Sequence, residues 1–303
     1  MIESLLPADA AIIFCPRNDI DIEEGTKTYA QKIPYLRSQN FDFVFISDAR
    51  LYIFVDIANA LRNPQTYLTD DGTCTILAMH SLQTYGTYFA LSKSTCVERQ
   101  RKIEEVKKRY GLWDLPPVKY DLFTVFDYES TEEITVIQNP MRHYQHVHER
   151  IDEESVLFIG QPLTTSGYFS SDVYIEYIHK IVAHYAGKKI KYLPHPRQCH
   201  DEMQKLIGID SVDIVDTKLA AETLLTSLDT APSIVCGFYS AALWNVAKFQ
   251  RGVSTHAFKI STDHFRPEII NRRTRNSFIT DVDAIDLYYN YFKKRIHVLE
   301  NVN

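Results

Sequence analysis

The sequence predicts an α/β fold of two units that face each other across a cleft. Short apolar runs alternate with helix-like segments along both halves of the chain, a pattern typical of parallel sheets. This alternation fades between Ser130 and Glu154, where the apolar periodicity is weak. We therefore expect one unit over residues 1–145 and a second over residues 155–303, joined by a linker.

The composition fits an ordinary globular protein. The chain has 303 residues, 45% of them hydrophobic, which is enough for two cores. Its net charge of −6 argues against nucleic acid as a partner, because nucleic-acid binding usually needs a broad basic surface. No run approaches the roughly 18 apolar residues of a membrane span, and no signal-peptide pattern opens the chain. The cysteines are scattered without a CxxC pair, which favours reduced thiols in the cytoplasm: Cys15, Cys74, Cys96, Cys199 and Cys236.

The apolar runs give the order of elements in each half. In the first half we expect strands at 11–15, 43–46, 66–68 and 122–126, and helices at 26–36, 52–61 and 98–110. In the second half we expect strands at 156–159, 190–193, 212–215, 233–236 and, as the last one, 253–258, with helices at 173–185, 218–228 and from 241. Three histidines fall in the linker, at 143, 146 and 148. Their irregular spacing lacks a partner cluster, so we expect an exposed linker rather than a metal site.

The segment after the strand at 190–193 is the strongest candidate for a ligand site. Pro194 and Pro196 bracket His195 and stiffen the loop. In an open α/β sheet, ligands bind at this end of the strands. A titratable donor at His195 and a fixed charge at Arg197 would suit an anion. A plain turn histidine is the alternative.

A pair of aspartates follows the strand at 66–68. Adjacent residues of an extended chain point in opposite directions, so only one of Asp70 and Asp71 is expected to reach a ligand. That carboxylate would suit general-base chemistry on a hydroxyl. The other would orient the loop through backbone hydrogen bonds, with Gly72 allowing a tight turn. An ordinary Asp-Gly turn is the alternative.

Two further strand ends carry candidate ligand-binding residues. The stretch Gly237-Phe238-Tyr239-Ser240 runs from a strand into a helix, so free N–H groups and the helix dipole are available to a phosphate. Ser240 also suits a helix N-cap, and both roles are compatible. The stretch Gly160-Gln161-Pro162 is a weaker signal of close approach by a ligand or by backbone. The chain lacks a Walker loop and the GxGxxG, HExxH and GxSxG motifs, which disfavours the commonest NTPases, dehydrogenases, proteases and esterases.

Taken in order, these motifs resemble those of bacterial sialyltransferases of the two-domain GT-B type, most closely glycosyltransferase family 52. The resemblance spans roughly residues 43–258 and rests on Thr69-Asp70-Asp71-Gly72-Thr73, Gly160-Gln161-Pro162, Pro194-His195-Pro196-Arg197-Gln198 and Tyr239-Ser240-Ala241-Ala242-Leu243. It implies two Rossmann-like domains. Because the chain starts close to its first strand, we expect the first domain to be shortened by its opening strand-helix unit, either through truncation of the sequence or because this branch has a smaller acceptor domain. In family 52 an aspartate can follow the proline of the Gly-x-Pro stretch, whereas this chain has Leu163 there.

The resemblance implies an inverting, metal-independent transfer of sialic acid from CMP-sialic acid to a sugar hydroxyl. Asp71 or Asp70 would be the general base, and His195 would assist the departing phosphate. The residues implied in binding the donor, which is a substrate and not a cofactor, are Gly160, Gln161, Pro196, Arg197, Tyr239 and Ser240. The acceptor would be a bacterial surface glycan, lipooligosaccharide or capsule, with a galactose-terminated end expected. Transfer from CMP-Kdo or another nonulosonic acid, and a non-catalytic glycan-assembly protein, are the alternatives; a homodimer is left open.

The C-terminal region raises the question of a membrane surface. Basic residues gather at Arg272, Arg273 and Arg275, and aromatic residues precede a second basic group at Tyr288, Tyr289, Tyr291, Phe292, Lys293, Lys294 and Arg295. Aromatic rings beside cations suit a lipid interface. This favours weak attachment to the inner face of the cytoplasmic membrane. A C-terminal helix that packs its aromatic residues on the core is the alternative.

Overall fold

The computed structural model describes residues 21–49, 51–63, 65–87, 97–273 and 279–300. The chain forms two compact units, one of Met1–Thr69 with Leu91–Leu122 and one of Asp70–Ala90 with Phe123–Asn303. This division differs from the boundary expected near residues 145–155, because the second unit already begins at Phe123 and also includes Asp70–Ala90. The expected strand at 11–15 lies outside the described residues. The α/β class with parallel sheets is confirmed.

The first unit is built from three helices, two parallel strands and the first two residues of a further strand, β3 (Asp121–Thr124), among its described residues. The three helices and the two parallel strands are α1 (Ile22–Ser38), β1 (Val44–Ile46), α2 (Tyr52–Leu61), β2 (Thr66–Thr69) and α4 (Val97–Arg109). Tyr29 of α1 lies at the centre of the core, together with Ile33. Its hydroxyl donates a 2.7 Å hydrogen bond to Asp56, whose carboxylate also pairs with Lys107 at 2.6 Å. The three helices are therefore joined by a buried polar contact as well as by apolar packing.

The second unit contains the remaining elements. Those before the large sheet are α3 (Cys74–Tyr85), the end of β3 (Asp121–Thr124), β4 (Val136–Gln138), η2 (Arg142–Tyr144) and β5 (His146–Val147). The sheet and its connections are β6 (Ile151–Ile159), α5 (Ser171–His184), β7 (Lys189–Leu193), α6 (His200–Ile207), β8 (Val212–Ile214), α7 (Ala221–Thr226), β9 (Ala231–Gly237), α8 (Ala241–Phe249), β10 (Gln250–Arg251), β11 (Ser254–Phe258), η3 (Thr262–His264), α9 (Pro267–Ile270), α10 (Asp281–Phe292) and β12 (His297–Leu299).

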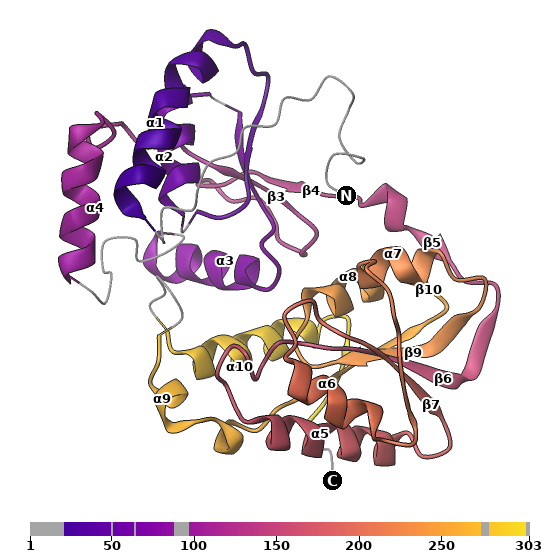
Figure 1. Ribbon diagram of the computed structural model, residues 1–303. Helices are drawn as coiled ribbons and strands as arrows, with labels where there is room; N and C mark the ends of the chain where they lie inside the picture. Colours follow the sequence, from indigo (N-terminus) through magenta and orange to yellow (C-terminus); the bar gives the residue numbers. More distant parts are fainter. Residues whose placement is uncertain (1–20, 50, 64, 88–96, 274–278, 301–303) are drawn as a thin grey trace. The chain divides into compact units, whose positions relative to one another are not determined.

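The large sheet has the strand order of a doubly wound nucleotide-binding fold. Its six strands run β8-β7-β6-β9-β11-β12, and their pairings are parallel. In chain order this is 3-2-1-4-5-6, in which the direction of winding reverses between the first and fourth strands. Here that reversal falls between β6 and β9. In Figure 1, α5 and α6 lie on one face of this sheet and α7, α8 and α10 on the other.

Burial on both faces explains why the central strands are continuous apolar runs. Val156 and Phe158 of β6 are fully buried, as are Tyr192 of β7 and Val235 of β9. Trp244 belongs to α8, on the face of the sheet opposite to α5 and α6, and is also fully buried. The core of the second unit thus holds β6, β7 and β9 firmly, which fixes where their C-terminal ends emerge.

Three expectations about this unit are wrong. The strand at 253–258 is not the last, because β12 follows it and pairs with β11. The linker is not exposed throughout, since β5 pairs with β10 and His148 is buried against Gln250, with 2.7 Å between His148 Nε2 and Gln250 Oε1. The sequence patterns also missed α3 and α6 altogether.

The C-terminal aromatic residues form part of the core. Tyr288, Tyr289, Tyr291 and Phe292 of α10 are all buried, and a capping box between Thr280 and Asp283 starts the helix. These rings are therefore not available to a lipid interface, and the alternative of a core-packed helix is the one observed. The position of Arg275 lies outside the described residues. Among the helices that the structure describes, none is long and apolar enough to cross a membrane.

Candidate active site

Three strand ends meet at the point where the large sheet reverses its winding. Ile159, the last residue of β6, pairs with Leu193 on one side and with Gly237 on the other. The loops that begin at Gly160, Pro194 and Phe238 therefore leave the same edge of three adjacent parallel strands. Neighbouring strands lie about 4.8 Å apart, so these loops start within about 10 Å of one another. Ligands of doubly wound sheets bind at this kind of edge.

Gln161 joins the loop after β6 to the loop after β9. Its side chain is buried, and its Oε1 accepts a 2.8 Å hydrogen bond from the backbone N–H of Tyr239. Tyr239 is itself buried among Tyr288 and Tyr289. Gln161 and Tyr239 are therefore structural residues of the edge, and their side chains are covered by the protein.

Gly160 is required by the crowding at the end of β6. A Cβ atom at this position would lie 2.7 Å from the hydroxyl of Tyr192, 2.9 Å from Oε1 of Gln198 and 2.9 Å from the carbonyl oxygen of Leu193. Real Cβ contacts of this length are essentially absent from proteins. The close approach comes from the protein itself, so this glycine lets the loops after β6 and β7 pack together.

His195 is held as one defined tautomer. The backbone N–H of Arg197 donates a 3.0 Å hydrogen bond to Nδ1 of His195. A backbone amide can only donate, so Nδ1 must accept, and the proton of the neutral ring sits on Nε2. Burial lowers the pKa of His195 below its ordinary value, and the nearby charge of Arg197 lowers it further. The half-buried ring is thus a neutral N–H donor at pH 7.

Pro196 and Arg197 form the exposed turn that follows. The carbonyl oxygen of Arg197 accepts a 3.1 Å hydrogen bond from the hydroxyl of Thr165, which belongs to the loop after β6. The backbone of Arg197 is therefore held by the loop after β6, while the residue as a whole is exposed. A fixed positive charge beside His195 suits an anionic ligand.

Ser240 begins α8 as its N-cap. Its Oγ accepts a 3.3 Å hydrogen bond from the backbone N–H of Ala242. The backbone N–H of Leu243 donates a 3.0 Å hydrogen bond to the carbonyl oxygen of Ser240, and the helix dipole adds partial positive charge at this end. This end of α8 therefore combines the cap expected of Ser240 with a partial positive charge suited to a phosphate.

Asp70 is fixed by the last residue of β3 and the residue that follows it. Its two carboxylate oxygens accept hydrogen bonds from the hydroxyl of Thr124 at 2.5 Å and from the backbone N–H of Val125 at 2.7 Å. Burial raises the pKa of Asp70 above its ordinary value, although these hydrogen bonds act in the opposite direction. Because both oxygens are engaged, Asp70 acts as the residue that holds the loop.

Asp71 and Gly72 lie at the tip of the same loop and are exposed. Gly72 has φ of 57°, a left-handed conformation that favours glycine. A Cβ atom on Gly72 would lie 3.8 Å from Cβ of Ala241, the first residue of α8. The acidic loop therefore reaches the N-terminus of α8, directly beside Ser240.

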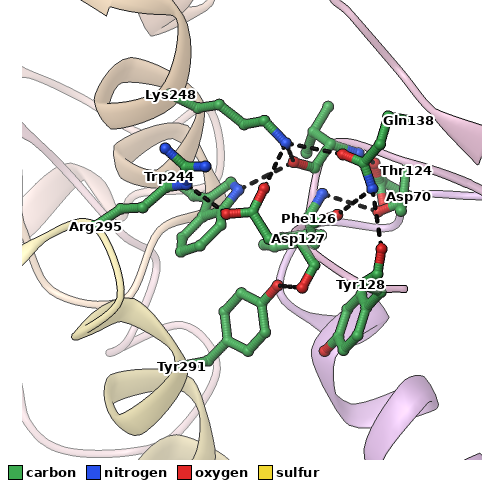
Figure 2. Close-up of polar contacts among 11 residues, drawn as sticks. Asp70, Thr124, Phe126, Asp127, Tyr128, Gln138, Trp244, Lys248, Tyr291 and Arg295 are labelled. Carbon is green, nitrogen blue, oxygen red and sulfur yellow. Dashed lines mark hydrogen bonds and ion pairs between the residues drawn. The ribbon is translucent and has the colours of Figure 1, made fainter.

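The segment 124–128 anchors the acidic loop to α8 and to the end of α10 (Figure 2). The carbonyl oxygen of Val125 accepts hydrogen bonds from the indole of Trp244 at 3.2 Å and from Lys248 at 2.6 Å. Asp127 pairs with Lys248 at 2.8 Å and with Arg295 at 2.5 Å. Burial raises the pKa of Asp127, but hydrogen bonds from Arg295 and Lys248 outweigh it, so the pKa falls below its usual value.

The structure thus gathers the predicted residues into one part of one unit. The aspartate pair meets the start of α8, and His195, Gly160 and Gln161 lie along the same sheet edge. No sequence pattern indicated Val125, whose contribution is its backbone, or Glu202, which accepts a hydrogen bond from Gln198. Gln198 belongs to the motif around His195, but no role was predicted for it. No group of three or more His, Cys, Asp or Glu side chains suited to a metal ion occurs among the residues that the structure describes.

The sequence matches the family model described as alpha-2,8-polysialyltransferase (POLYST) over residues 3–259. The match covers more than half of the chain, so the protein belongs to the α-2,8-polysialyltransferase family. It is accordingly a glycosyltransferase of a sialyltransferase family, as the motifs implied. Membership of glycosyltransferase family 52 in particular remains a prediction.

Other comparisons give distant likenesses. One solved structure is an alpha/beta-galactoside alpha-2,3-sialyltransferase from the luminous marine bacterium Photobacterium phosphoreum, with 12% identity, a TM-score of 0.47, and coverage of 90% of this chain and 84% of that one. The glycotransferase of kitacinnamycin has 10% identity, a TM-score of 0.43 and coverage of 92% and 80%. The spinosyn rhamnosyltransferase SpnG has 12% identity, a TM-score of 0.41 and coverage of 84% and 68%. No curated protein sequence matches the chain.

Proposed function

We propose that this protein transfers sialic acid from CMP-sialic acid to a sugar hydroxyl of a bacterial surface glycan, with inversion at the anomeric carbon. The observation that carries this proposal is the exposed Asp71 loop beside the phosphate-suited N-terminus of α8, with His195 on the same sheet edge. A candidate base and candidate phosphate ligands thus belong to one compact unit. The family membership supports sialyl transfer as the reaction.

Hydrogen-bond donors and a positive charge of this protein would bind the phosphate of the donor. The hydroxyl of Ser240 offers a neutral donor at the positive end of the α8 dipole, His195 offers its Nε2–H, and Arg197 offers a full positive charge. A CMP sugar has one phosphate with a single negative charge, which such a set of donors can balance. The proposed reaction therefore needs no metal ion.

The acceptor hydroxyl would be activated by Asp71. The oxygen of the acceptor hydroxyl would attack the anomeric carbon while the hydroxyl proton passes to the carboxylate of Asp71. The bond between the anomeric carbon and the phosphate oxygen breaks, and CMP leaves with that electron pair. The hydrogen bond from His195 strengthens as charge develops on the leaving oxygen, which is how preorganised donors lower a barrier.

The acceptor is the part of the proposal with two versions. The description of the family favours a sialic acid hydroxyl as acceptor, with α-2,8 linkage. A galactose-terminated lipooligosaccharide or capsule, as in family 52, is the version that the motifs suggest. For both versions we propose a cytoplasmic enzyme.

A product assay separates these versions. The purified protein is incubated with CMP-sialic acid and, in parallel, an oligosialic acid, a galactoside panel or no acceptor, and products are identified by mass spectrometry. Extension of oligosialic acid supports the first version, and sialylated galactosides support the second. If the protein turned over CMP-Kdo and not CMP-sialic acid, the proposed donor would be wrong and CMP-Kdo would take its place. If it turned over neither, and millimolar CMP caused no thermal shift, a non-catalytic protein would be favoured. Loss of activity in EDTA, restored by magnesium or manganese, would contradict the metal-independent reaction.

A further inference from the structure

Glu202 is a buried carboxylate close to the proposed site. It lies in the first turn of α6 and its relative exposure is 0%. Its described hydrogen-bond partners, Thr164 and Gln198, are neutral. Burying a carboxylate is costly unless hydrogen bonds compensate for lost water, so an apolar residue would serve a purely structural position better. The hydrogen bonds of Glu202 explain why a carboxylate occupies this buried position.

Gln198 connects Glu202 to His195. The backbone N–H of His195 donates a 3.2 Å hydrogen bond to Oε1 of Gln198, and the backbone N–H of Gln198 donates a 2.9 Å bond to the carbonyl oxygen of His195. Because an amide N–H can only donate, the side-chain atom of Gln198 that faces it must be the oxygen. The Nε2 group of Gln198 therefore points inward, where it donates to Glu202 and to the hydroxyl of Tyr192.

Glu202 also reaches the loop that follows β6. Its second carboxylate oxygen accepts a 2.6 Å hydrogen bond from the hydroxyl of Thr164. The next residue, Thr165, donates to the carbonyl oxygen of Arg197 at 3.1 Å. One buried carboxylate thus joins the loop after β6 to the turn after β7, and a second hydrogen bond runs beside it.

We infer that Glu202 is a positioning residue, which acts through Gln198 to hold His195 and through Thr164 to align the two loops. This inference rests on the proposed function for its effect on catalysis, but the contacts themselves do not depend on it. The carboxylate accepts from both donors, whereas a leucine of similar size would leave Thr164 and Gln198 without these hydrogen bonds. Burial raises the pKa of Glu202, while hydrogen bonds from Thr164 and Gln198 favour the ionised form.

The experiment compares three substitutions on the same helix. Glu202→Gln keeps one acceptor for Gln198 and supplies an N–H for Thr164, whereas Glu202→Leu removes both contacts. Asp201→Leu is the matched control, because Asp201 is exposed and neighbours Glu202 in α6. Thr164→Val, which removes one hydrogen bond to Glu202 with little change of shape, serves as a milder variant should Glu202→Leu fail to fold.

The first measurement needs no substrate. The ring nitrogens of His195 are observed by ¹⁵N NMR across a pH titration, with His195→Asn used for assignment. We expect the Nε2–H tautomer and the depressed pKa of His195 to persist in the wild type, Glu202→Gln and Asp201→Leu. In Glu202→Leu the pKa should move toward its ordinary value near 6.5, with a smaller shift in Thr164→Val. Unchanged His195 signals in folded Glu202→Leu and Thr164→Val would overturn the inference.

The second measurement separates positioning from binding. A misplacement of about 1 Å can cost up to about 100-fold in rate, so kcat should fall by about 10–100-fold in Glu202→Leu, with KM for the donor changed by less than about threefold. Glu202→Gln should restore most of the rate. If the wild type transfers no sialic acid, the proposed function fails, while the NMR titration still decides whether Glu202 positions His195.

Discussion

Asp70 and Val125 are joined by a hydrogen bond of 2.7 Å from the backbone N–H of Val125 to the carboxylate. The carbonyl oxygen of the same residue accepts from Trp244 and Lys248 of α8. One peptide segment therefore connects the acidic loop to the helix whose N-terminus suits the donor phosphate. This connection assigns different tasks to two adjacent aspartates, and it makes them separable by experiment.

Asp71→Asn should reduce kcat by about 10²- to 10⁴-fold, the usual loss when a general base is removed. Its exposed side chain makes a large change in stability unexpected, so the thermal midpoint should stay within about 2 °C of the wild type. Binding of CMP, measured by calorimetry, should persist because the proposed base faces the acceptor.

Asp70→Asn tests whether the adjacent aspartate has a structural role instead of a catalytic one. It replaces one acceptor oxygen with an N–H₂ group, which conflicts with a donor at Thr124 or Val125, so the free energy of unfolding should fall by about 1–3 kcal/mol. If Asp70→Asn abolished turnover while staying as stable as the wild type, and Asp71→Asn kept near-normal turnover, Asp70 would be the base.

His195→Ala should lower kcat by a similar 10²- to 10⁴-fold and should also weaken donor binding. Since the pKa of His195 lies below its ordinary value, protonation adds a positive charge only below about pH 6.5. Affinity for a non-hydrolysable CMP-sialic acid analogue should therefore rise as the pH falls from 7.5 to 5.5. The same calorimetric series on His195→Ala should show no such rise; equal pH dependence in both proteins would exclude His195 from the phosphate site.

Gly160→Ala should destabilise the second unit by about 1–3 kcal/mol, the range for forcing extra atoms into a packed site. The added Cβ meets Tyr192 and Gln198 below 3.0 Å. Gly208→Ala provides the control, because its Cβ would lie 3.5 Å from the carbonyl oxygen of Lys205, an ordinary contact. Urea unfolding of the two variants should differ clearly, and equal midpoints would mean that the strand end can relax around the methyl group.

Lys248→Met should lower the free energy of unfolding by about 1–3 kcal/mol, because it leaves Val125, Asp127 and Gln138 without a shared donor. The control is Lys180→Met, which breaks only an exposed pair with Glu176 on α5 and should cost less than about 0.5 kcal/mol. Comparable losses in the two variants would show that the Lys248 contacts add little.

His256 should make the stability depend on pH. Burial lowers its pKa to about 4, and the nearby His297 and His184 add to this effect. Below pH 6.5 the unfolded chain takes up a proton that the folded protein does not, so stability present at pH 7.5 is lost as the pH falls toward 4. Thermal midpoints measured from pH 7.5 to 5 should decline in the wild type and decline less in His256→Gln.

The parallel strands were the most predictable elements, because a strand that is buried on both faces consists of a short continuous run of apolar residues. The helix α3 was missed because five of its buried residues, Thr75 to Met79, are consecutive, so that together with Ser81 they leave no apolar stripe. The helix α6 was missed because it has eight residues, of which only Glu202 and Leu206 are buried. A glutamate on a short helix has the same sequence signature whether it faces water or the core.

The candidate site was predictable to the extent that it depends on residue type. Histidine between prolines, glycine at a strand end and serine before a helix each carry a local conformational preference that sequence displays. The role of Val125 depends on its N–H and carbonyl groups, which every residue except proline possesses, so no side-chain pattern marks it. The partners of Asp70 are separated from it by more than fifty positions, and only the folded chain brings them together.

The larger unit is discontinuous in sequence, since the chain leaves it after Ala90 and returns at Phe123. Placing Asp70 and Asp71 therefore requires closure of an intervening loop of 32 residues, Leu91–Leu122, at an entropic cost of about 3 kcal/mol plus a constant. During synthesis from the N-terminus, the two carboxylates emerge long before α8 and the strands that receive them. The acidic loop is thus placed late in folding, and a nascent chain has no assembled centre until α8 has been made.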